Sequence, residues 1–90
     1  MAQAIVDPDE LRRFATDLKK FNSDLQNRAT ALVGHLNELG TTWRDQENTK
    51  FCEEFEEHMR AIARFIDSSN RHIPYLLRKA ERIEEYLQQH

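Results

Sequence analysis

The sequence predicts an all-α protein, an antiparallel two-helix hairpin that we expect to dimerise into a four-helix bundle. Two long segments carry apolar residues at steps of three and four, which is the period of one helix face. A short stretch that holds the only tryptophan separates them, and two glycines and two prolines are too few for a sheet with many turns. We assign residues 1–90 to a single helical-hairpin domain.

The first helix is expected over about residues 8–39. Asp7 can cap it, Pro8 suits its first position, and the acidic residues that follow favour the positive end of the helix dipole. Gly34 lies inside this helix and is either a tolerated surface glycine, which we favour, or a point of close helix contact. The expected seam facing the second helix is Leu11, Phe14, Leu18, Phe21, Leu25, Ala29, Leu32, Leu36 and Leu39.

The turn is expected at residues 40–44. Gly40 suits a left-handed helix end, and Thr41 or Thr42 can cap the next helix. Asp45 would then supply a carboxylate to the first turn of that helix. The turn residues that we single out are Gly40, Trp43, Arg44 and Asp45, with the Trp43 side chain expected to close the end of the hairpin core.

The second helix is expected over about residues 45–88. Its seam is Phe51, Phe55, Met59, Ile62, Ile66, Ser69, Ile73, Leu76, Ala80, Ile83 and Leu87. Acidic residues gather in its first part and basic residues towards its end, which suits the helix dipole and indicates a solvated face. Pro74 removes one backbone hydrogen bond, but the seam continues through it, so we expect a kink near residue 74 rather than a loop.

Counting from the turn predicts where the hairpin ends. Leu11 lies as far before Thr42 as Pro74 lies after Trp43, so the first helix should end opposite Pro74. Residues 75–90 would then overhang with an apolar face that calls for a partner.

A flanking row on the second helix also predicts a partner. His58, Phe65, His72, Lys79 and Tyr86 recur every seven positions beside the seam, which widens the apolar face beyond what one helix covers. A homodimer of antiparallel hairpins is our preferred solution, and a heterodimer with a related hairpin is the alternative. The expected partner face comprises Phe65, His72, Tyr75, Leu76, Leu77, Ile83, Tyr86 and Leu87.

Catalysis, cofactors and metals are not expected. A di-iron site in a bundle needs glutamate three residues before its histidine, and Phe55 stands there for His58. Ser68 and Ser69 near His72 lack an oxyanion hole, because the N–H groups of a regular helix are already bonded. Cys52 is the only cysteine, so neither an intrachain disulfide nor a cysteine-based zinc site can form.

The charge and hydropathy of the chain exclude two classes of partner. A net charge of -3 provides no positive field for nucleic acid. No apolar run approaches the roughly 20 residues that span a bilayer, and glutamates on the polar faces disfavour a membrane surface. The N-terminus does not read as a signal peptide, so we expect the protein either to stay in the cytoplasm or to be secreted by a leaderless route.

The central Leu39-Gly40-Thr41-Thr42-Trp43-Arg44-Asp45 element, between two long helices in a short chain, resembles the Trp-Xaa-Gly (WXG) superfamily of early-secreted-antigen-type proteins. In that family the tryptophan and glycine form the turn between the helices; here Trp43 matches and Asp45 stands in place of the glycine. Exported members tend to carry Tyr-x-x-x-acid after the second helix, whereas Tyr86 is followed at that spacing by His90 and Tyr75 by Lys79.

The resemblance implies a dimeric substrate or associated partner-binding protein of type VII secretion, which presents its turn and tail to a secretion-machinery protein. The alternative is a cytoplasmic helical adaptor or assembly module that uses the same faces and is not exported.

Overall fold

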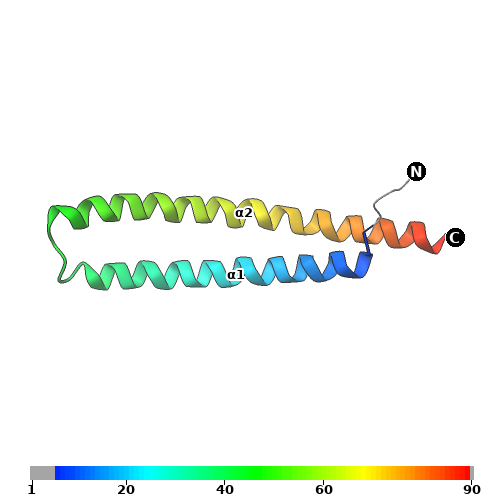
Figure 1. The fold of residues 1–90 in the computed structure, drawn as a ribbon, viewed down its shortest axis with the longest axis horizontal. Helices are drawn as coiled ribbons and strands as arrows, with labels where there is room; N and C mark the ends of the chain where they lie inside the picture. Colours follow the sequence, from blue (N-terminus) through cyan, green and yellow to red (C-terminus); the bar gives the residue numbers. More distant parts are fainter. Residues whose placement is uncertain (1–5, 90) are drawn as a thin grey trace.

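The computed structural model describes residues 6–89, which form two long α-helices joined by a short turn (Figure 1). Helix α1 spans Pro8–Leu39 and helix α2 spans Gln46–Gln88. The helices lie side by side and antiparallel in a rod of 68 × 23 × 17 Å. The predicted all-α hairpin is therefore confirmed, and its pairing into a four-helix bundle stays a prediction.

The start of α1 is fixed by local chemistry. The Asp7 side chain accepts a hydrogen bond of 2.9 Å from the Asp9 N–H, and the Asp7 carbonyl accepts one of 3.0 Å from the Leu11 N–H. Pro8 occupies the first turn, where its missing N–H would have no helical acceptor. Asp7 thus satisfies the Asp9 N–H, and Pro8 has no N–H that needs an acceptor.

The seam of α2 lies where the sequence predicts it. From Phe55 to Ile83 every predicted seam position is buried or half-buried, and Ile66, Ser69 and Ala80 are the most enclosed. Phe51 and Leu87, at the two ends of the predicted seam, are exposed. α2 continues through Pro74 to Gln88, and the bend expected near residue 74 stays a prediction.

The seam of α1 differs from the prediction by one position in its first half. Phe14 and Phe21 were expected to face α2, but they are 56% and 53% exposed. Ala15 and Asn22, one residue further on, are each 1% exposed. Small side chains at these positions let the helices approach closely, and the larger rings then flank the contact instead of filling it. Leu32 and Leu39 are also exposed.

The open end of the hairpin corrects the predicted overhang. The Arg12 guanidinium pairs with the Glu84 carboxylate at 2.8 Å, and Ala80 is fully buried, so α1 covers α2 well past Pro74. The count assumed that residues equally far from Thr42 and Trp43 face each other, whereas Arg12 pairs with Glu84 and Asn22 bonds to Ser69 and Asn70. Only the last residues of α2 project beyond α1 (Figure 1).

Candidate functional site

The turn begins as a continuation of α1. The Gly40 N–H donates to the Leu36 carbonyl at 3.0 Å, and the Trp43 N–H donates to the Leu39 carbonyl at 2.9 Å. Gly40 therefore keeps a right-handed conformation, with φ -62° and ψ -15°, and the predicted left-handed helix end is wrong. No residue in the described range 6–89 has a positive φ.

Asp45, two residues after the tryptophan, is the centre of the turn. One of its carboxylate oxygens, Oδ1, accepts from the Asn48 N–H at 3.1 Å and from the Trp43 indole Nε1–H at 2.9 Å. Asp45 is thus the N-cap of α2, a role that we had predicted for Thr41 or Thr42. The two threonine hydroxyls instead donate to carbonyls at the end of α1, because the chain is still helical there.

Further bonds tie the turn together. The Asn48 amide donates to the Trp43 carbonyl at 2.6 Å, and its oxygen accepts from the Cys52 thiol at 3.3 Å. Arg44 donates from Nε to the Thr41 carbonyl at 3.0 Å. All four turn residues singled out from the sequence therefore take part in this structure, whereas the role of Asn48 was missed. The sequence feature that could have indicated this role is the position of Asn48, three residues after the capping Asp45.

An aromatic stack continues from the turn into α2. The Trp43 and Phe51 rings have centroids 5.7 Å apart, and the Phe51 and Phe55 rings follow at 5.9 Å. Phe55 and Trp43 are half-buried, and Phe51 is exposed. The stack carries apolar surface out to solvent, and closure of the hairpin core by the Trp43 side chain stays a prediction.

One side of the hairpin, which we call the aromatic face, gathers most of the exposed apolar side chains. Phe21 of α1 and Phe65 of α2 make an edge contact across the helices with centroids 6.3 Å apart. Phe14 and His72 line a hollow of about 640 Å³ on the same side, together with Tyr75. By helical spacing from these residues, the aromatic face comprises Phe14, Phe21, Leu32, Leu39, Phe51, His58, Phe65, His72, Tyr75, Lys79 and Tyr86.

The predicted partner residues are divided between several places in the structure. Phe65, His72, Tyr75 and Tyr86 belong to the aromatic face. Leu76 and Ile83 are half-buried in the contact with α1. Leu77 is exposed seven residues after Asn70, which places it on the opposite side, and Leu87 is exposed near the end of α2. The sequence did not single out Phe14 and Phe21, because they were assigned to the contact between the helices.

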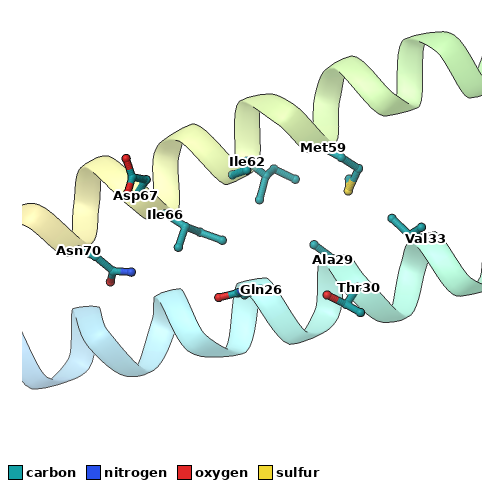
Figure 2. A pocket seen from close by; sticks show the side chains of 10 residues that line it. Gln26, Ala29, Thr30, Val33, Met59, Ile62, Ile66, Asp67 and Asn70 are labelled. Carbon is teal, nitrogen blue, oxygen red and sulfur yellow. The ribbon is translucent and has the colours of Figure 1, made fainter.

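A groove runs along the opposite side. Its widest part, of about 410 Å³, has an apolar floor of Met59, Ile62 and Ile66, which project toward Ala29 and Val33 of α1 (Figure 2). Gln26, Thr30, Asp67 and Asn70 supply polar groups at its edges. The apolar surface here is recessed between the helices, whereas on the aromatic face the rings stand exposed.

Charge is distributed unevenly along α2. Residues 46–57 contain five glutamates and one lysine, and residues 71–82 contain four basic residues and one glutamate. At the acidic end, hydrogen bonding from Arg60 lowers the pKa of Glu57, and the nearby positive charges act in the same direction. The hairpin therefore has an acidic end near the turn and a basic stretch towards the open end.

Residues 6–89 contain no group of three or more histidine, cysteine, aspartate or glutamate side chains arranged to hold a metal ion. Within the same range, neither helix has a stretch that is both long and apolar enough to cross a membrane.

Comparison with known proteins gives one family match and several structural matches. The family model WXG100, described as proteins of 100 residues with WXG, matches residues 3–87. Crystal structures of the secreted protein EsxB from Bacillus anthracis str. Sterne superpose with a TM-score of 0.76 at 27% sequence identity. The match covers 93% of this chain and 97% of wild-type EsxB, and 96% and 98% for the selenomethionine-labelled form. No curated protein sequence gives a match.

Proposed function

Because this chain belongs to the WXG100 family, we propose that it is a non-enzymatic helical-hairpin protein of type VII secretion, either an exported substrate or a protein that pairs with one. The similarity to EsxB, which is described as a secreted protein, supports export. The alternative is a cytoplasmic adaptor that uses the same surfaces. In both cases the activity is binding through the exposed faces of the hairpin.

The aromatic face is the observation that carries this proposal. Among the described residues, the buried apolar side chains are Ala15, Ile66 and Ala80, which is a very small core for two helices of this length. Phe14, Phe21 and Phe65 each leave half or more of their surface in water. Covering such rings gains about 25 cal/mol per Å² of apolar area, so a second layer of helices would stabilise the fold considerably.

A second copy of the chain is the partner that we favour, laid antiparallel on the aromatic face. In that arrangement the acidic first part of α2 lies beside the basic later part of the partner's α2. A two-fold axis repeats this favourable contact, which is what an isologous interface requires. A heterodimer with a related hairpin uses the same face and is the alternative.

Sedimentation equilibrium tests the dimer. We expect a mass twice 10.7 kDa for the wild type at micromolar concentration. Phe21→Glu and Phe65→Glu should shift the protein to monomer, because each introduces a charge into the paired face. Lys20→Glu places the same side chain at an exposed neighbouring position and should leave the dimer intact. If the wild type stays monomeric at micromolar concentration, the homodimer proposal is wrong.

Fractionation of cells with and without a type VII motor ATPase tests export. The protein should appear in the medium only when the motor is present. Removing residues 85–90, which follow Glu84, should abolish that appearance. Retention inside the cell in both strains would favour the cytoplasmic adaptor.

A further inference from the structure

A layer of polar side chains crosses the middle of the hairpin. The Asn22 amide is 1% exposed and donates from Nδ2 to Ser69 Oγ at 3.0 Å and to Asn70 Oδ1 at 2.9 Å. Its own oxygen, Oδ1, is buried and has no hydrogen-bond partner within residues 6–89. A buried acceptor without a donor loses its hydration and gains nothing in return, so this layer destabilises the contact in which it lies.

Pro74 weakens α2 at the same level. It has no N–H, so the carbonyl of Asn70 lacks the donor that a helix normally provides four residues later. A hollow of about 360 Å³ lies beside it, lined by Lys19, Asn22, Asn70, Ile73 and Pro74 among others. The polar layer, the missing backbone bond and the hollow therefore coincide.

The parts of the hairpin on either side of this layer have better-packed and better-paired side chains. Towards the open end, Ala15 and Ala80 are fully enclosed, and the Arg12 and Glu84 side chains pair at 2.8 Å. Towards the turn, Ile66 is buried, and the Trp43 indole is held by Asp45 at 2.9 Å. Each part has contacts of its own that do not include Asn22.

We propose that the Asn22 layer is a joint at which the hairpin opens in two steps. The open-end half, residues 8–20 with residues 75–88, separates as one cooperative unit while the turn half stays paired. Separate opening follows because the layer between the halves holds an unpaired buried acceptor, a missing backbone bond and a hollow. The inference concerns the hairpin itself and stands whether or not the chain is exported.

Hydrogen exchange measured along the chain tests the joint. Simple fraying gives a gradual loss of protection towards the open end, whereas a joint gives a step between residues 66 and 75 and a common opening rate beyond it. Asn22→Leu, made in a Ser69→Ala background so that no buried hydroxyl loses its partner, removes the unpaired acceptor and fills the layer. Compared with Ser69→Ala alone, it should slow exchange in the open-end half about tenfold and abolish the step. Pro74→Ala restores the N–H and should reduce the step as well.

The matched control is Asn27→Leu, the same replacement at an exposed position of α1, which should leave the step unchanged. All proteins are compared in the same oligomeric state, verified by light scattering. A smooth gradient in the wild type would overturn the proposal. Equal effects of Asn22→Leu and Asn27→Leu, or a step that survives both Asn22→Leu and Pro74→Ala, would overturn it too.

Discussion

Arg12 and Glu84, which are 72 residues apart in sequence, meet at the open end of the hairpin in a two-point contact. The guanidinium donates hydrogen bonds of 3.1 and 2.8 Å to the two carboxylate oxygens. Two such bonds between one guanidinium and one carboxylate are characteristic of arginine pairs. They hold the start of α1 in register with the last turns of α2.

This pair predicts a pH dependence of stability. Hydrogen bonding and positive charge from Arg12 lower the pKa of Glu84. The pair therefore contributes stability that is fully present above the ordinary glutamate pKa of about 4.3 and is lost as the pH falls through the lowered value. The difference in free energy of unfolding between wild type and Glu84→Gln should shrink from pH 5 towards pH 3, as measured by urea unfolding.

Replacing Asp45 should loosen the turn. Asp45→Ala removes both the α2 cap and the acceptor of the Trp43 indole, and loss of a cap alone costs about 0.5–2 kcal/mol. Thermal unfolding measures that cost, and fluorescence of the only tryptophan reports the change around its ring.

Two further variants separate the roles of Asp45. Asp45→Asn keeps a side-chain oxygen and should retain most of the stability. Asp45→Gly introduces a tolerable cap that offers no side-chain acceptor, so it should change the fluorescence more than the stability. Identical spectra for wild type and Asp45→Gly would contradict the assigned indole bond.

Enlarging the small residues of the seam should be costly. Ala15→Leu places a larger side chain where the helices touch, because Ala15 is 1% exposed against α2. Overpacking of this kind typically costs about 1–3 kcal/mol, so the melting temperature should fall. Ala31→Leu makes the same change at an exposed position of α1 and serves as the control. If Phe14 instead of Ala15 faced α2, the two substitutions would lower the melting temperature equally.

The two glycines should respond differently to alanine. A Cβ at Gly34 meets nothing within 4 Å, and alanine is favoured inside a helix by roughly 0.5–1 kcal/mol, so Gly34→Ala should stabilise the hairpin. A Cβ at Gly40 lies 3.3 Å from the Asn37 carbonyl oxygen, which offsets part of the gain. The melting temperatures of Gly34→Ala and Gly40→Ala, measured by thermal unfolding, give this comparison. A loss of dimer mass in Gly34→Ala would reveal close helix contact in the pair.

The sequence predicts α2 better than α1, and the reason lies in residue size. In α2 large apolar residues such as Ile62, Ile66 and Ile73 hold most of the buried and half-buried positions, so their spacing reveals the seam even though Ser69 and Ala80 are small. In α1 the most buried positions are Ala15 and Asn22, while the large rings lie beside them. A seam predicted from the spacing of hydrophobic residues in α1 therefore runs through Phe14 and Phe21 and misses Ala15 and Asn22. The smaller residues also recur every seven positions, but nothing local marks them as buried.

The turn shows a similar limit. Its residues were identified correctly, but their roles depend on where the chain reverses. Gly40 was expected to make the reversal, whereas the structure makes it at Asp45, after backbone bonds have carried the helical path to Trp43. The register is displaced as well, because Arg12 pairs with Glu84 whereas the count from Thr42 and Trp43 placed Leu11 opposite Pro74. Errors of a few residues at a turn change every pairing further along two antiparallel helices.

The slender shape of the molecule has a consequence for transport. A rod 68 Å long and 23 × 17 Å across can travel end-on through an opening little wider than a pair of helices. A second hairpin laid on the aromatic face adds a layer to the shorter of those two dimensions. The width of any channel that admits the folded protein would therefore show whether it moves singly or in pairs.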